Sequence, residues 1–98
     1  MSKYTLSNKA QSDLERIYQY TEIEFGQVQA ENYLLGIHET LEALSSEPNL
    51  AQDVSDIRAG YLRYIFRKHY IFFKQRQKDI FVVRVLHQQM KVHLHLTS

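Results

Sequence analysis

The sequence contains no cysteine, which excludes disulfide bridges and thiolate metal sites and gives no sign of an oxidising compartment. Glycine and proline are scarce, with three and one among 98 residues, so the composition does not favour a linker or a disordered tail. No apolar run reaches the roughly 18 residues that span a bilayer, and the first residues lack the apolar segment of a signal peptide. We therefore expect a single cytoplasmic domain over residues 1–98 that makes no membrane contact.

Charge is divided unevenly along the chain. Residues 1–57 hold three Lys or Arg against ten Asp or Glu, a net charge of −7, whereas residues 58–98 hold nine against one, a net charge of +8. Like charges repel, so this clustering favours a basic face that attracts an acidic partner or a nucleic acid. A solvated sheet edge protected by lysines is the alternative.

The spacing of apolar residues predicts two helices in the acidic half. Tyr4 and Leu6 alternate with polar residues, as in a short strand, and Ser7 then suits a helix N-cap. Gly26 is placed to end the first helix in a left-handed conformation, and the second helix is expected to end before Pro48. The apolar stripe of the first helix consists of Ala10, Leu14, Ile17, Thr21 and Phe25. That of the second consists of Ala30, Tyr33, Leu34, Ile37, Leu41 and Leu44.

The basic half is rich in β-branched and aromatic residues. Three strands are predicted at residues 61–66, 70–74 and 80–87, joined by turns at 67–69 and 76–79 that are short enough for hairpins. Residues 49–56 are expected to form a loop. The predicted fold is α+β, with a short N-terminal strand and a two-helix antiparallel hairpin packed on one face of an antiparallel β-sheet. Residues 80–83 are apolar on both faces of the sheet, so the second face needs further cover.

No motif supports covalent or cofactor chemistry. Without cysteine, the nucleophile would have to be a serine or threonine beside a base, and no motif surrounds any serine. His93 and His95 alternate and would share a face in a strand, but no acid lies nearby to complete a metal shell. We therefore expect no metal site and no cofactor.

Arg84 is the most informative basic residue. It lies between Val82-Val83 and Val85-Leu86, and therefore projects from a central strand. A charge at that place is expected either to form a salt bridge to a helix glutamate or to be exposed in a groove that faces a partner. Ribonuclease chemistry is also open, because basic residues can hold phosphate while another group moves the proton. The residues available for it are Arg63, Arg67, Arg84 and His87.

Several segments match one family pattern in order and spacing. Residues 84–90, RVLHQQM, fit RVLH-x-x-M, and residues 10–17 fit A-x-x-D-L-x-x-I. Residues 57–61 fit I-R-x-G-Y, and residues 69–73 resemble H-x-I-F-Y. With the glycine at position 26, these segments resemble the ParE toxins over residues 4–92. The chain departs from that family at Lys91, where an acid is usual, and at Phe73-Lys74, where Tyr-Arg is usual.

This resemblance implies a RelE/ParE-like fold and the toxin of a type II toxin–antitoxin system, which inhibits DNA gyrase and thereby replication and is not an enzyme. The implied antitoxin is a ParD-like protein with a ribbon-helix-helix dimer, whose C-terminal segment folds on the toxin. Toxin and antitoxin would form a hetero-oligomer that reaches operator DNA only through the antitoxin. The alternatives are a ribosome-dependent mRNA endonuclease of the RelE type and a binding module without a toxic target.

Two sets of contact residues are predicted. Antitoxin contacts are expected to combine aromatic anchors with cations that meet acids of the antitoxin. These residues are Tyr33, Arg58, Tyr61, Arg63, Phe73, Arg84 and His87. Contacts with the target are expected in the C-terminal segment, at Met90, Lys91, His93 and His95.

Overall fold

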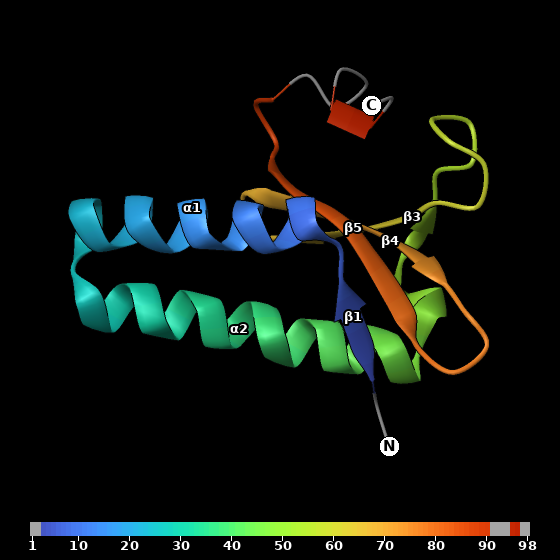
Figure 1. Cartoon of the computed structure of the whole chain (residues 1–98), viewed down its shortest axis with the longest axis horizontal. Helices are drawn as coiled ribbons and strands as arrows, with labels where there is room; N and C mark the ends of the chain where they lie inside the picture. The colour runs from blue at the N-terminus through green and yellow to red at the C-terminus, as the bar shows by residue number, and fades with distance from the viewer. Residues whose placement is uncertain (1–2, 91–94, 97–98) are drawn as a thin grey trace.

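The computed structural model describes residues 3–90 and 95–96 (Figure 1). Its elements are β1 (Tyr4–Leu6), α1 (Asn8–Phe25), α2 (Gln27–Ser46), the 3-10 turn η1 (Pro48–Leu50), β2 (Gln52–Asp53), β3 (Leu62–Phe66), β4 (His69–Gln75) and β5 (Ile80–His87). This order confirms the α+β prediction. The region expected to be a loop contains part of η1 and the two-residue strand β2. Among the described residues, no helix is long and apolar enough to cross a membrane.

The five strands form one sheet in the order β1-β5-β4-β3-β2. Strands β3, β4 and β5 pair antiparallel, as predicted. The unpredicted strand β2 adds to β3, also antiparallel, whereas β1 pairs parallel to β5. The sheet is therefore mixed, because the chain's first strand lies beside its last and runs parallel to it.

The start of α1 is fixed to the edge of β5. Ser7 is the N-cap, as predicted: its Oγ accepts a hydrogen bond from the Ala10 N–H at 2.9 Å. The same hydroxyl donates to the Val83 carbonyl at 2.7 Å, and the Ser7 N–H donates to the Val82 carbonyl at 2.9 Å. Since β1 ends where Leu6 pairs with Val82, α1 covers the edge of β5 beyond that point.

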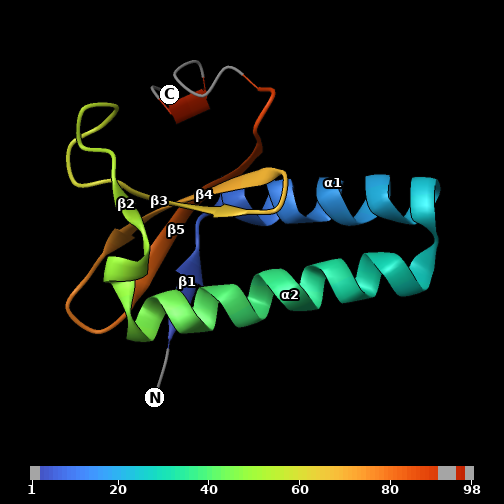
Figure 2. The ribbon, with the colours of Figure 1, turned by 180° about the vertical axis from the view of Figure 1, so that it is seen from behind.

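Gly26 joins the two helices directly. Its φ of 93° and ψ of 167° stop α1 in a backbone conformation that glycine adopts easily and other residues do not. The hairpin extends well past the end of the sheet (Figures 1 and 2). For that reason Phe25, predicted to lie on the buried stripe of α1, is 68% exposed.

The core has one part on each face of the sheet. The helix-side part is formed by α1, α2 and the sheet, and its buried members are Ala10, Ile37, Leu41, Leu44, Ile71, Phe73, Ile80, Val82 and Val85. On the opposite face, called here the second face, a smaller cluster consists of Val54, Tyr61, Phe72, Leu86 and Leu96. The expected cover of the second face is thus supplied in part by the chain itself, through the segment before β3 and residue 96.

Candidate functional site

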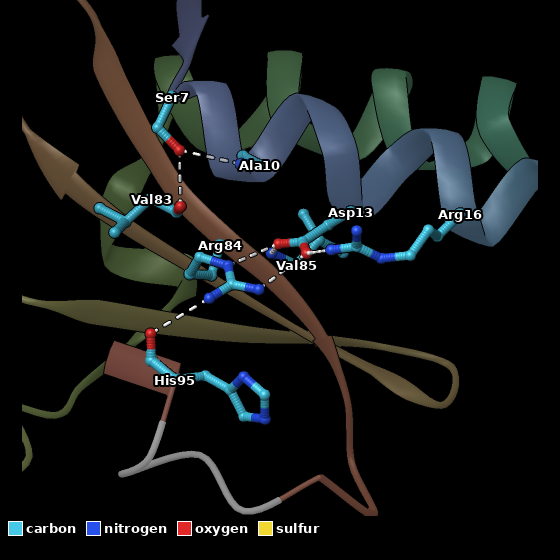
Figure 3. Close-up of polar contacts among 8 residues, drawn as sticks. All are labelled: Ser7, Ala10, Asp13, Arg16, Val83, Arg84, Val85 and His95. Atoms are coloured by element: carbon cyan, nitrogen blue, oxygen red, sulfur yellow. Dashed lines mark hydrogen bonds and ion pairs between the residues drawn. The ribbon is translucent and has the colours of Figure 1, made fainter. Parts of the chain in front are cut away.

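A buried ion pair joins α1 to β5 (Figure 3). The Asp13 carboxylate accepts hydrogen bonds from Arg84 Nε at 2.8 Å and from Arg84 Nη2 at 2.9 Å. It also accepts from the Val85 N–H at 3.0 Å and from Arg16 Nη2 at 3.0 Å. The side chains of Arg84 and Asp13 are only 8% and 4% exposed. Arg84 Nη1 also donates to the His95 carbonyl at 3.1 Å.

These contacts show that Arg84 is paired. Its partner is an aspartate of α1 and not the helix glutamate that the sequence suggested. The interpretation of Arg84 as a residue exposed in a groove was wrong. The hydrogen bonds to Asp13 raise the pKa of Arg84, against the opposing effect of burial. The sequence did carry a signal for this pair. Asp13 lies three residues after Ala10 and four before Ile17, so it is an acid on the buried side of α1.

The second face carries two of the other predicted contact residues, Tyr61 and Arg63. Tyr61 is 7% exposed and packs in the second-face cluster, whereas Arg58 is exposed. Arg63 lies over the Tyr70 ring, with Cζ 4.8 Å from the ring centroid, and its Nη2 donates to Gln52 Oε1 at 2.8 Å. Within the described part of the chain, the buried Nε of Arg63 has no hydrogen-bond partner. An acceptor from a partner chain would satisfy it.

A cluster of aromatic and imidazole side chains lies where α2 packs against the end of β3, the start of β4 and the end of β5. The Tyr33 hydroxyl and His69 Nδ1 are 2.7 Å apart, and the His69 and His87 rings meet edge to face at 5.3 Å. Arg67 Cζ lies 5.5 Å from the Tyr33 ring centroid and 5.4 Å from that of Phe66. Burial, together with the charge of His87, lowers the pKa of His69 to about 4, although Asp13 opposes the shift. His69 is therefore neutral at pH 7, and Arg67 places a positive charge beside the Tyr33 ring.

A groove runs between α2 and β3, beside this cluster. It has a volume of about 390 Å³. Its lining residues are Gly36, Glu39, Thr40, Ala43, Leu44, Leu50, Tyr64, Phe66 and Arg67. Gly36 lets Phe66 approach the helix, since a Cβ at that position would lie 2.9 Å from the ring. We call this feature the α2–β3 groove. Its small side chains on α2, apolar floor and cationic end suit a bound polypeptide with apolar anchors and an acid.

The remaining predicted residues are scattered. Phe73 is 0% exposed in the helix-side core, so its prediction as a surface anchor was wrong. Met90 is 39% exposed and His95 is half-buried. Lys91 and His93 lie outside the described residues.

The set of residues considered for ribonuclease chemistry is not brought together. Arg63 and Arg84 both pair with Phe72 across the strands and share the second face with it. His87 pairs with His69 on the helix side. No cluster of three or more His, Cys, Asp or Glu that could hold a metal ion occurs among the residues that the structure describes.

Comparisons with known proteins agree with this architecture. A family model for the ParE toxin of the type II toxin–antitoxin system parDE matches residues 4–92. Toxin ParE1 of Caulobacter vibrioides is 34% identical over 96 residues, which cover 98% of this chain and 99% of that protein. Toxin ParE1 of Mycobacterium tuberculosis is 35% identical over 96 residues, or 97% of this chain and 98% of that protein.

Two solved structures share the fold. A chain of the chromosomal ParDE system from P. aeruginosa has a TM-score of 0.75 at 20% identity, covering 89% of this chain and 96% of that one. A chain of the YoeB–YefM complex from Staphylococcus aureus has a TM-score of 0.60 at 17% identity, covering 89% of this chain and 97% of that one.

Proposed function

We propose, from the premise that this chain belongs to the ParE toxin family of type II toxin–antitoxin systems, that it inhibits DNA gyrase and is neutralised by a ParD-like antitoxin. The observation that carries the proposal is the family match over residues 4–92, with ParE1 relatives aligned over nearly their whole length. The action is exerted through protein contacts, and the antitoxin neutralises the toxin by binding to it directly.

The α2–β3 groove is the surface that best fits an antitoxin helix. On its α2 side, the small residues Gly36, Thr40 and Ala43 alternate with Glu39 and Leu44, so a second helix can approach closely at the small positions. Leu50 and Tyr64 offer apolar contacts. Arg67 lies at one end of the groove and attracts an acid of the antitoxin. Tyr33 contacts both Phe66 and Arg67 and therefore borders the same surface, with His69 hydrogen-bonded behind it.

A second antitoxin contact is proposed on the second face. Arg63 has an unsatisfied Nε there, and Arg58 is exposed nearby in sequence. A carboxylate of the antitoxin would meet both the charge and the missing acceptor. Because Leu96 already packs on this face, the antitoxin segment must pass beside residue 96 or displace it. The target contacts predicted at Met90, Lys91, His93 and His95 stay a prediction.

Supercoiling of relaxed plasmid by purified gyrase tests the main proposal. Micromolar toxin is expected to inhibit the reaction, and an equimolar amount of cognate antitoxin is expected to restore it. Full supercoiling at that toxin concentration would reject gyrase as the target.

Matched α2 variants test the groove. Ala43→Glu places a charge in the groove at an exposed helix position, whereas Asn32→Glu places the same charge on α2 outside it. We expect Ala43→Glu to weaken antitoxin binding by at least about tenfold, because the acid is desolvated and repels an acidic antitoxin segment. Asn32→Glu is expected to bind like the wild type. Equal affinities of the two variants would place the antitoxin elsewhere.

A ribosome-dependent endonuclease remains the competing function. It predicts cuts inside translated codons after induction, visible by primer extension, whereas the gyrase proposal predicts intact transcripts.

A further inference from the structure

The helical hairpin ends in an exposed apolar tip. We define the hairpin tip as residues 20–28, the last turns of α1, Gly26 and the start of α2. Four large apolar side chains lie in it: Ile23 is 80% exposed, Val28 73%, Phe25 68% and Tyr20 64%. Every residue from 22 to 29 is exposed, because the hairpin runs past the end of the sheet (Figures 1 and 2). Nothing in the fold of the described chain requires apolar residues there.

The apolar side chains lie on more than one side of the tip. Successive residues of an α-helix are rotated by about 100°, so Ile23 lies opposite the buried Thr21, whereas Phe25 lies close to the side of Thr21. A flat partner surface would cover only one of these sides. An occupant that covers both must be concave, so that the tip enters it as a plug.

The charge of the tip limits what that occupant is. No Lys or Arg occurs between Arg16 and Arg58, and the tip carries Glu22 and Glu24. Burial raises the pKa of Tyr18 at the base of the tip, and the negative charges of Glu22 and Glu31 raise it further. Nucleic acid and anionic lipid are therefore repelled. A second tip is repelled as well, since it would bring four glutamates together without a cation.

We propose that the hairpin tip is a docking plug for the toxin's target, received by an apolar slot with a cationic rim on that protein. The inference rests on the proposed function, in which the target is gyrase, an enzyme that must carry cationic surfaces in order to hold DNA. The apolar side chains supply affinity inside the slot, and the glutamates steer the approach. The tip is distinct from the α2–β3 groove, so the toxin has separate surfaces for its target and its antitoxin.

A pair of isoleucine variants tests the plug. Ile23→Thr alters the tip, and Ile65→Thr makes the same change at a 52% exposed position on β3, outside both the tip and the groove. We expect Ile23→Thr to reduce growth inhibition in cells lacking the antitoxin and to bind immobilised gyrase subunits at least about tenfold more weakly than the wild type. Ile65→Thr is expected to match the wild type in both assays. Both variants are expected to keep the wild-type circular dichroism spectrum, and Ile23→Thr is expected to keep the wild-type antitoxin affinity.

Charge variants provide the second arm. Glu24→Lys is expected to slow association with gyrase subunits at low salt, with the difference shrinking as salt rises, whereas Glu47→Lys at the far end of α2 has no such effect. The tip proposal is overturned if Ile23→Thr remains as toxic as Ile65→Thr. It is also overturned if sedimentation shows that the wild-type toxin is a dimer and that the Ile23→Thr variant is a monomer. Wild-type toxin that fails to bind or inhibit gyrase overturns the gyrase assignment instead, and the growth assay then still decides the role of the tip.

Discussion

The ion pair between Asp13 and Arg84 gives the sharpest test of the structure. Replacing Arg84 with Ala removes two hydrogen bonds from Asp13 and leaves a carboxylate that is 4% exposed without its main counter-charge. Breaking a buried pair in this way costs about 3–5 kcal/mol, because the remaining charge stays desolvated. A domain of this size has a total unfolding free energy of about 5–15 kcal/mol, so the loss is a large fraction of it. We expect the variant to be partly unfolded at 37 °C.

Urea titration followed by far-UV circular dichroism measures this cost. Arg16→Ala is the matched control, because Arg16 donates to the same carboxylate at 3.0 Å but is 67% exposed. Solvent screens that pair, so its loss is expected to cost less than about 0.5 kcal/mol. Arg84→Lys keeps the charge but loses the bidentate hydrogen bonds to Asp13, so its loss of unfolding free energy is expected to lie between those of Arg84→Ala and Arg16→Ala. The reasoning is refuted if Arg84→Ala lies within about 1 kcal/mol of the wild type, or if both alanine variants lose the same amount.

Three further predictions concern the histidine cluster, the hairpin joint and residue 96. The pKa of His69 falls from 6.5 to about 4 on folding, so between these pH values the unfolded chain binds more protons than the folded one. The contribution of His69 to the free energy of unfolding is therefore complete above pH 6.5 and is lost as the pH drops toward 4. His69→Asn is expected to flatten that part of the curve, and parallel curves in pH-dependent urea titrations would contradict it. Gly26→Ala is expected to cost about 1–3 kcal/mol from backbone strain alone, since no atom lies within 4 Å of the added Cβ; an unchanged urea midpoint would show that the joint relaxes freely. Leu96 is 3% exposed in the second-face cluster, so Leu96→Ala is expected to lower the free energy of unfolding by about 2–5 kcal/mol. A loss below about 0.5 kcal/mol would show that residue 96 does not complete the cluster.

The helices and strands were predictable because their signals are local. The cap at Ser7, the stop at Gly26 and the apolar stripes depend on neighbouring residues, and the structure reproduces them except at Phe25. The parallel pairing of β1 with β5 was not predictable, because it joins Tyr4 to Ile80 across nearly the whole chain. The exposed tip was missed for a related reason. Phe25 fits the stripe of α1, but periodicity does not reveal that the sheet ends before the helix does.

The contact residues were harder to predict than the fold. Sequence patterning showed that Arg84 is unusual, but it did not distinguish a partner's acid from Asp13, 71 residues away. Phe73 was predicted to be a surface residue because both faces of an apolar strand carry apolar side chains, so the sequence does not show which face is buried. In addition, β5 has one extra residue, Val83, opposite Phe72 and Phe73, and this bulge changes the register there. Tyr33 and His87 do lie in one cluster, which His69 completes.

The state of plasmid DNA and of mRNA in one culture tests the central claim most directly. Toxin is induced without antitoxin, and the topology of a reporter plasmid and the integrity of a translated transcript are measured in the same samples. We predict that the plasmid loses negative supercoils while the transcript stays intact, and that co-expressed antitoxin reverses the change. A normally supercoiled plasmid together with transcripts cut inside their codons would contradict the account.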